Sequence, residues 1–505
     1  MNLSSKQIAT FLCGMMLSHA VVAQQASPNT SLSQANQLPL SGRTGQPGSV
    51  SAQQSAVPGT TQSVNTINSN LSVQGSYSQS ALSGKPLAGK LSLRDAVAMG
   101  LEYNLGAIAD NNAVLQAHGQ MRVTRSTLLP NLNTSLREVV QQTDLATIGL
   151  HLPNVPTIIG PYNYFDLRGT LTQALVDLTA WNNYRASQAN LTAQRMAAKD
   201  AQDLIVLAVG GTYLQVIAAQ GRVDSSQAQV QTAKAVYEQT LERRKVGLSA
   251  QIDANRALVE YQTQQQRLTT LQNDLTVQKI NLSRLIGLQP DASFELADSV
   301  PYTAPPTLSY DEAVKVAMEG RSDLKSADAS LYAAQRNHAA ARSERLPSLT
   351  VSGDYGVTGV NPSQSHGTFN VTGTLRVPIW QGGKTEGDIE MAHAALNQRR
   401  AEQSQTRGQI QSDVRLALLN LNAATTQVQV AESNRKVAKE NLELTRQRLE
   451  SGIADSVEVT QAQETVATAE LDYITSLLAH NLAKLSLARA LGGAEDKLTA
   501  YLAVP

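Results

Sequence analysis

The feature that most constrains this chain is a tandem duplication. LSLRDAVAMG at 91 corresponds to LSYDEAVKVA at 308, and STLLPNLNTSL at 126 corresponds to SERLPSLTVSG at 343, both 217 positions apart. ERRKVGLSAQID at 242 and QRLESGIADSVE at 447 are 205 apart, as are SRLIGL at 283 and ARALGG at 488. The first copy therefore contains an insertion, which we place in the Pro-rich stretch 151–161. One structural unit must be built twice, over 91–290 and 308–495.

Two long tracts without proline predict helical hairpins. Proline is absent from 162 to 289 and from 379 to 504, and both tracts are rich in Ala, Gln, Leu, Arg and Glu. A glycine with turn-like neighbours interrupts each tract, Gly247 in the first and Gly452 in the second. Leucines recur at heptad-like spacing, for example at Leu268, Leu271, Leu275, Leu282 and Leu285. Each tract is therefore predicted to fold as two antiparallel helices.

The predicted helix lengths match one another. The helices from about Ala180 to Lys245 and from about Gly383 to Glu450 would each span about 100 Å at 1.5 Å per residue. The helices that precede Pro130 and Pro347, and those that follow each turn, have about 36 residues and would span about 54 Å. Two short helices placed end to end would equal one long helix. This arithmetic predicts a long cylinder.

Segments of alternating polarity interrupt the helices at equivalent places in both copies. Residues 349–359 and 368–379 place apolar side chains on one face and polar side chains on the other, around a turn at 361–363. This is the length and pattern of a transmembrane β-strand. In the first copy 165–171 alternates in the same way, and 132–143 more weakly. Because four strands cannot close a barrel in lipid, the chain is expected to oligomerise. Aromatic residues near the strand ends predict an interfacial girdle: Tyr162, Tyr164, Trp181, Tyr355 and Trp380.

The amino-terminal part is predicted to be a leader followed by a disordered extension. Residues 1–23 have the pattern of a signal peptide, with Lys6, an apolar run and a small-residue site that ends at Ala23. Cys13, the only cysteine, lies in this leader without the small residues of a lipoprotein signal, so neither a disulfide nor a lipid anchor is expected. Residues 24–90 are dominated by small polar residues and are predicted to be a disordered low-complexity extension.

Composition argues against several classes of function. A formal net charge of zero and a pI near 7.1 provide no basic field for nucleic acid. The most apolar run, 204–219, contains two glycines, which favours a buried helix over a membrane span. The chain has no nucleophile elbow, phosphate loop or paired-carboxylate motif, and its helical histidines are scattered singly. We therefore expect neither catalysis nor a cofactor or metal.

With these motifs in order, the sequence resembles the TolC-like outer membrane factor family over 91–493. The resemblance rests on VPIWQGG at 377, LPSL at 346, VGLSAQIDANRA at 246 and SGIADSVEVTQAQ at 451. It implies a mainly α fold with a membrane β-barrel portion, in which duplicated hairpins form an α-helical barrel in the periplasm. It further implies a homotrimer with a twelve-stranded barrel in outer-membrane lipid. The implied partners are a periplasmic adaptor (membrane fusion) protein and an inner-membrane pump.

The resemblance also assigns roles to particular residues. The expected adaptor-contacting tips are Gly247, Leu248, Gly452 and Ile453, and the expected strand-helix junction is Pro378, Trp380, Gly382 and Gly383. The acidic residues of the family's periplasmic entrance correspond to Asp253 and Glu458, and its second acidic position is Gln461 here. Asp253 is at least as well explained as an acid at a helix start, which leaves Glu458 as the stronger gate candidate. Where the family has an arginine this chain has Ala454, so an arginine–acid lock of that kind is not expected.

The leading functional hypothesis is an outer-membrane exit duct that passively conducts small molecules in a tripartite efflux system. Within the same fold, a type I secretion channel for polypeptides is the alternative. A periplasmic coiled-coil adaptor or scaffold is an alternative of another class. It would account for the hairpins and the leader, but not for alternating strands at equivalent places in both copies.

Overall fold

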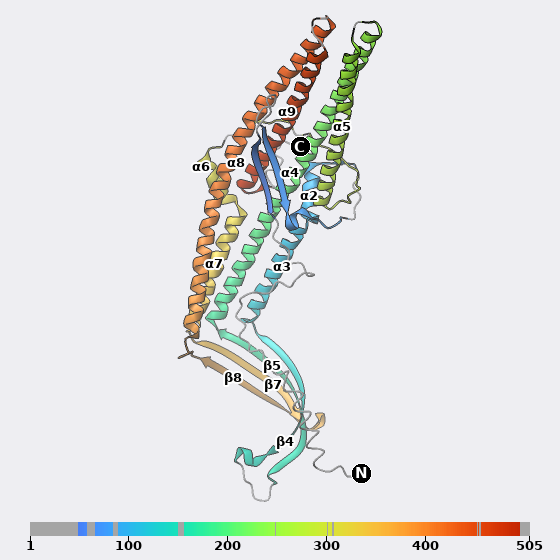
Figure 1. Cartoon of the computed structure of the whole chain (residues 1–505). Helices are drawn as coiled ribbons and strands as arrows, with labels where there is room; N and C mark the ends of the chain where they lie inside the picture. Colours follow the sequence, from blue (N-terminus) through green and yellow to red (C-terminus); the bar gives the residue numbers. More distant parts are fainter. Residues whose placement is uncertain are drawn as a thin grey trace, which may run out of the picture. The chain divides into compact units, whose positions relative to one another are not determined.

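The computed structural model in Figure 1 describes residues 49–57, 66–83, 89–149, 156–247, 249–299, 301–305, 308–451, 453 and 456–494. All of these lie in the second of two compact units, Pro47–Pro505. The expected signal peptide, 1–23, lies outside the described residues.

The same order of elements occurs twice. The first copy contains α2 (Leu93–Tyr103), α3 (Leu105–Ser126), β4 (Asn131–Asp144), β5 (Ile158–Val176), α4 (Leu178–Lys245) and α5 (Gln251–Ile286). The second contains α6 (Tyr310–Gly320), α7 (Ser322–Ser343), β7 (Ser348–Gly359), β8 (Ser365–Arg376), α8 (Lys384–Glu450) and α9 (Ser456–Ala490). The parallel strands β3 (Lys90–Leu91) and β6 (Glu295–Leu296) pair the start of the first copy with the segment that follows its end.

The long helices α4 and α8 form the backbone of the two copies. In each copy the long helix packs against the helix before the strands and against the helix after the turn, as the length match predicts. Of the described helices, only α4 has a stretch long and apolar enough to cross a membrane, and 72% of that stretch is buried inside the protein. Its most apolar part surrounds Tyr213, whose hydroxyl donates to the carbonyl of Leu91 at 2.9 Å. We therefore interpret α4 as a core helix, in agreement with the sequence.

Each helix that precedes the strands is broken, which corrects the prediction of one helix of about 36 residues. Asn104 separates α2 from α3 and Arg321 separates α6 from α7, and both have extended backbone angles near φ −64° and ψ 130°. Both side chains are buried and are held by polar contacts. Asn104 accepts from the amide of Gly106 at 2.9 Å and donates to the carbonyl of Tyr77 at 2.8 Å. These contacts compensate for the helical hydrogen bonds that the break removes.

The four long strands form one antiparallel sheet in the order β4-β5-β7-β8. Each copy contributes one hairpin, and the two hairpins join through β5 and β7. The second strand of copy two ends at Arg376 rather than at 379 as predicted, because its last partner, Ser348, is the first residue of β7. In copy one, residues 158–164 of β5 pair with β4 alone, so the insertion lengthens this hairpin.

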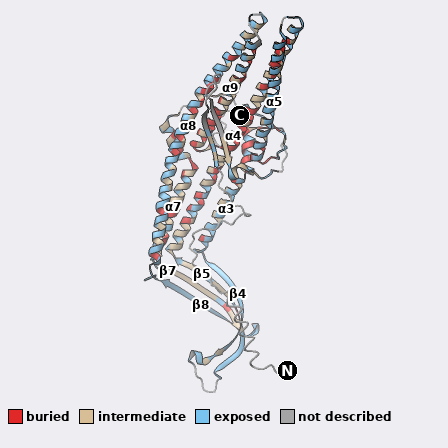
Figure 2. Ribbon diagram, in the orientation of Figure 1, coloured by how far each residue is buried: buried red, intermediate tan, exposed pale blue. Residues whose placement is uncertain are grey.

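One face of this sheet is apolar and exposed. The register aligns Leu349 with Leu375 and Tyr355 with Phe369, so the apolar positions of neighbouring strands share a face. Their side chains are largely uncovered in the protomer; Phe369 is 78% exposed and Leu136 is 72% exposed. Figure 2 shows the edge strands β4 and β8 as mostly exposed. An uncovered apolar face of this extent needs another apolar phase or another protein against it.

The disorder predicted for residues 24–90 does not apply to residues 49–57 and 66–83. Strands β1 (Ser49–Val57) and β2 (Thr66–Gln74) pair as an antiparallel ribbon. Val50, Leu71 and Val73 pack against the core cluster of α4, α5 and α9. The few apolar residues of this polar segment thus face the helices. A ribbon that packs on an existing core needs fewer apolar residues than a free-standing domain. Composition alone could not reveal that docking surface.

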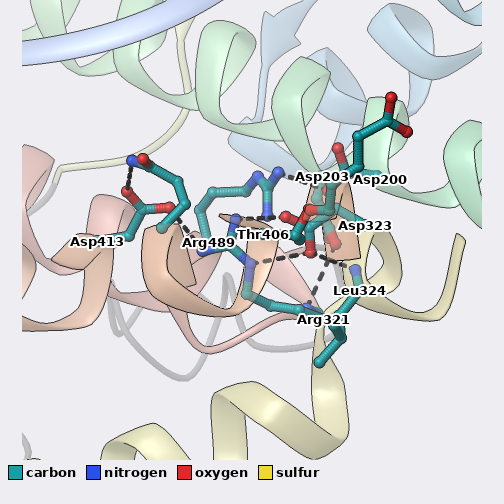
Figure 3. Close-up of polar contacts among 11 residues, drawn as sticks. Asp200, Asp203, Arg321, Asp323, Leu324, Thr406, Asp413 and Arg489 are labelled. Carbon is teal, nitrogen blue, oxygen red and sulfur yellow. Dashed lines mark hydrogen bonds and ion pairs between the residues drawn. The ribbon is translucent and has the colours of Figure 1, made fainter. Parts of the chain in front are cut away.

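A buried ionic network joins the two copies where α4, α8 and α9 meet the break after α6 (Figure 3). Arg321 is 5% exposed and donates to Asp323 at 2.6 Å and to Asp413 at 2.7 Å. Arg489 of α9 donates to Asp200 of α4 at 2.5 Å. Asp203, also on α4, accepts from the backbone amide of Ala494 at 2.8 Å. Helices of both copies are therefore fixed to one another below the hairpin turns.

Candidate channel site

The first hairpin turn places a glycine in the left-handed conformation that a tight reversal favours. Gly247 has φ +79°, and nothing lies within 4 Å of the position that a Cβ would occupy. Its amide donates to the carbonyl of Arg244 at 2.9 Å, which ends α4. Beside it, Val246 is 70% exposed. Leu248 lies outside the described residues.

The second turn also exposes an apolar side chain. Gly452 lies outside the described residues, but Ile453 is described and is 71% exposed. The amide of Ile453 donates to the carbonyl of Arg448 at 2.9 Å. Val246 and Ile453 therefore give each tip an exposed aliphatic side chain, which fits contact with a partner.

Asp253 caps the start of α5. Its Oδ2 accepts from the backbone amide of Ala250 at 3.3 Å and from the hydroxyl of Ser249 at 3.4 Å. A carboxylate in this position satisfies a free amide and interacts favourably with the helix dipole. The sequence analysis left two roles for Asp253, a cap at the helix start and a gate residue. The structure shows it as a cap.

Glu458 pairs with an arginine on the other helix of its own hairpin. Arg448 Nη1 lies 2.9 Å from Glu458 Oε2, and both side chains are about half exposed. The arginine precedes the turn, whereas the family pattern places one after it, so sequence reasoning missed this pair. Gln461, one turn further along α9, is exposed. The gate candidates Asp253 and Glu458 lie on different hairpins of the protomer.

The strand-helix junction of copy two turns on two glycines. After Pro378, Gly382 and Gly383 adopt φ +61° and +84°, and Gly383 is the residue before the first turn of α8. This left-handed backbone is accessible to glycine without strain. Trp380 is 86% exposed beside this junction, where an interfacial aromatic residue is expected.

The polar face of the sheet carries a group of charges that sequence reasoning did not single out. We call Arg137, Asp166, Arg168 and Asp354 the Arg168 cluster. Arg168 Nε lies 3.3 Å from Asp166, its Nη1 donates to Asp354, and its Nη2 lies 3.1 Å from the hydroxyl of Thr368. Alternation placed Asp166, Arg168 and Asp354 on the polar face, but their partnership depends on a β5–β7 register that no local pattern encodes.

Two histidines that are distant in sequence are neighbours in the structure. The ring centroids of His338 on α7 and His393 on α8 are 5.7 Å apart, although the two residues are isolated along the sequence. Over the described part of the chain, no three His, Cys, Asp or Glu side chains are grouped so as to hold a metal ion.

Comparison with known proteins agrees with the repeated architecture. The family model described as outer membrane efflux protein matches residues 110–288 and 313–493, one match in each copy. The chain is 24% identical over 389 residues to outer membrane protein TolC of Vibrio cholerae, covering 74% of this chain and 85% of the relative.

Another relative and a solved structure extend the comparison. The chain is 25% identical to the toluene efflux pump outer membrane protein TtgF of Pseudomonas putida, covering 75% of this chain and 78% of the relative. The crystal structure of CusC superposes with a TM-score of 0.68 at 18% identity, covering 82% of this chain and 96% of that one. The family match spans most of both copies, and this chain is a member of the outer membrane efflux protein family.

Proposed function

We propose that three copies of this chain form a passive exit duct for small molecules through the outer membrane. The carrying observation is the four-stranded sheet, which exposes one apolar face and runs directly into helices far longer than a membrane is thick. The strands would lie in lipid, and the helices would continue the bore into the periplasm.

The open edges of the sheet support oligomeric closure. In the described residues β4 and β8 are each paired on one side only. Unpaired strand edges are not tolerated in lipid, so β8 of one copy would pair with β4 of the next. Three copies give twelve strands, the number that the family resemblance implies.

The tips would form the periplasmic end of the duct. Gly247, Leu248, Gly452 and Ile453 would contact a periplasmic adaptor, which connects the duct to an inner-membrane pump. The exposed side chains of Val246 and Ile453 support this role. Glu458 would line the entrance, whereas Asp253 would mainly fix the start of α5. The relative named for toluene efflux favours small molecules over polypeptides as cargo.

Two matched lysine variants test the proposal. Val371 lies on the apolar face and Asn370 on the polar face of the same strand, and both are exposed in the protomer. V371K should prevent a heat-modifiable oligomer from accumulating in the outer membrane, because a lysine in lipid costs about 2–4 kcal/mol at mid-depth. N370K should still assemble.

The measurements are membrane fractionation, electrophoresis with and without heating, and conductance of the purified oligomer in planar bilayers. Recovery of a monomer from the periplasm without detergent, with no conductance, would contradict the duct and favour the scaffold. Equal behaviour of V371K and N370K would contradict the assignment of faces.

A further inference from the structure

The Arg168 cluster is built across three strands. Arg168 belongs to β5, Asp354 belongs to β7, and Thr368, which accepts from the guanidinium at 3.1 Å, belongs to β8. The arginine also contacts Asp166 on its own strand at 3.3 Å. Its guanidinium is thus held by two carboxylates and one hydroxyl. Such charge-assisted, multidentate contacts fix both its orientation and its position.

A glycine makes this reach possible. Gly356 lies directly opposite Arg168 in the register, between β5 and Thr368 on β8. A Cβ at Gly356 would lie 3.1 Å from both Cα and Cβ of Arg168 and 2.8 Å from the carbonyl of Leu167. The missing side chain leaves space for the arginine to cross β7. The guanidinium therefore lies along the sheet.

The cluster is balanced in charge. Arg168 faces two carboxylates, and Arg137, 4.0 Å from Asp166, provides the fourth charge. Between the cluster and the helices, the polar face carries neutral residues, including Thr172, Ser352 and Thr372. The next charge in that direction is Arg376 at the end of β8. Glu138 is charged but pairs with Phe165, two residues after Leu136, and so lies on the apolar face.

We propose that Arg168, with its carboxylate partners, sets the ion selectivity of the duct at the level of the strands. This inference rests on the proposed function, in which the polar face lines the bore. Three copies would place the cluster three times around the bore, as a ring without net charge. An ion that passes within one Debye length of the ring, about 8–10 Å at ordinary salt, is only partly screened from an unbalanced charge there. The balanced ring would thus admit small ions of either sign.

Removing one partner should tip this balance in a predictable direction. R168Q leaves Asp166 and Asp354 against Arg137 alone, an excess of one negative charge per copy, so the duct should become more permeable to cations. D354N leaves a positive excess and should make it more permeable to anions. The double variant R168Q/D354N removes one charge of each sign and should return close to the original selectivity.

The experiment is the reversal potential of the purified full-chain oligomer in planar bilayers under a KCl gradient. E138Q is the matched control, because it also removes one carboxylate from the strands, but on the apolar face. The expected result is opposite shifts for R168Q and D354N, near cancellation in the double variant and no shift for E138Q. If R168Q fails to assemble, R137Q provides the cation-selective arm, since the Arg137 side chain is 70% exposed.

Two outcomes would overturn the inference. Conducting R168Q and D354N channels that keep the original reversal potential would mean that the cluster only holds the sheet in register. A shift in E138Q as large as that in D354N would remove the assignment to the bore. Absence of conductance from the unmodified protein would instead contradict the proposed function.

Discussion

The ion pair between Arg448 and Glu458 illustrates how little of the entrance chemistry concerns stability. The two side chains face each other across one hairpin at 2.9 Å, but both are about half exposed. Exposed pairs of this kind add little to folding free energy. The main consequence of the contact is positional, because it holds the Glu458 carboxylate near the turn. In the proposed trimer, three such carboxylates would surround the entrance.

Replacement of Glu458 should open the entrance to current. We expect E458A and E458Q to reduce cation preference, because each removes a charge that attracts cations. We also expect them to raise single-channel conductance, because each removes the carboxylate that Arg448 holds near the turn. D253N is the matched control, since asparagine can retain the cap at the start of α5 while losing the charge. The measurement is conductance and reversal potential in planar bilayers. Unchanged current in E458A and E458Q would reject the gate role.

At the scale of elements, each copy locks its broken helix against a glycine at the end of its last helix. Gly287, which follows α5, has φ +81°, and a Cβ there would meet Tyr103 at 2.8 Å and the carbonyl of Ala81 at 2.5 Å. Gly492, 205 positions later, would meet the backbone of Gly320 and Arg321 at 2.8 Å. The same contact thus recurs at the break after α2 and at the break after α6. In copy one it also includes the amino-terminal segment.

Alanine at Gly287 should therefore destabilise the protein. We expect G287A to cost about 1–3 kcal/mol for the left-handed backbone alone, with a further penalty from the contact with Ala81. The check is the thermal unfolding midpoint followed by circular dichroism, together with the rate of proteolysis between residues 58 and 88. G119A is the control, because this helical glycine has open space around it and should gain about 0.5–1 kcal/mol. Equal midpoints for G287A and G119A would contradict the proposed lock.

At the scale of the whole molecule, the buried ionic network joins the copies through two carboxyls whose pKa values are shifted in opposite directions. Burial raises the pKa of Asp200, and the nearby Arg489 offsets this only in part. For Asp323, burial also acts to raise the pKa, but the hydrogen bonds and charge of Arg321 outweigh it and leave the pKa lowered. A lowered pKa stabilises the fold above the unfolded pKa, and this stabilisation is lost as pH falls through the folded value. A raised pKa stabilises the fold at low pH, and this is lost as pH rises through the folded value.

The two carboxyls should therefore give stability differences that change oppositely with pH. D323N should have a lower unfolding midpoint than the unmodified protein at pH 7, and the gap should close below about pH 4, the unfolded value for aspartate. For D200N the midpoint relative to the unmodified protein should rise as pH increases from 4 to 7. Midpoints measured across this range test both expectations. Exposed Asp291, which lies outside the network, supplies the control D291N for the loss of one surface carboxylate. Parallel profiles for D323N and D200N would contradict the account.

The sequence by itself determined the parts of this protein that depend on local periodicity. The spacing between copies indicated the repeated unit, and the proline-free tracts indicated α4, α5, α8 and α9 nearly to their observed ends. Alternation with a period of two separated Phe369 from Thr368 before any sheet was known. These features follow from backbone geometry within one segment, so neighbouring residues suffice to predict them.

Only the tertiary structure decided the features that depend on partners far along the chain. The helix breaks at Asn104 and Arg321 depend on polar groups of distant segments, which form hydrogen bonds with the two buried side chains. Strands β1 and β2 lie against the protein because helices of both copies receive their few apolar side chains. Arg168 finds Asp354 186 residues away because β5 pairs with β7 in one register, across a glycine that leaves space. Such contacts join residues far apart in the sequence. They contribute to stability only after the intervening chain has been brought together, so local sequence patterns do not predict them.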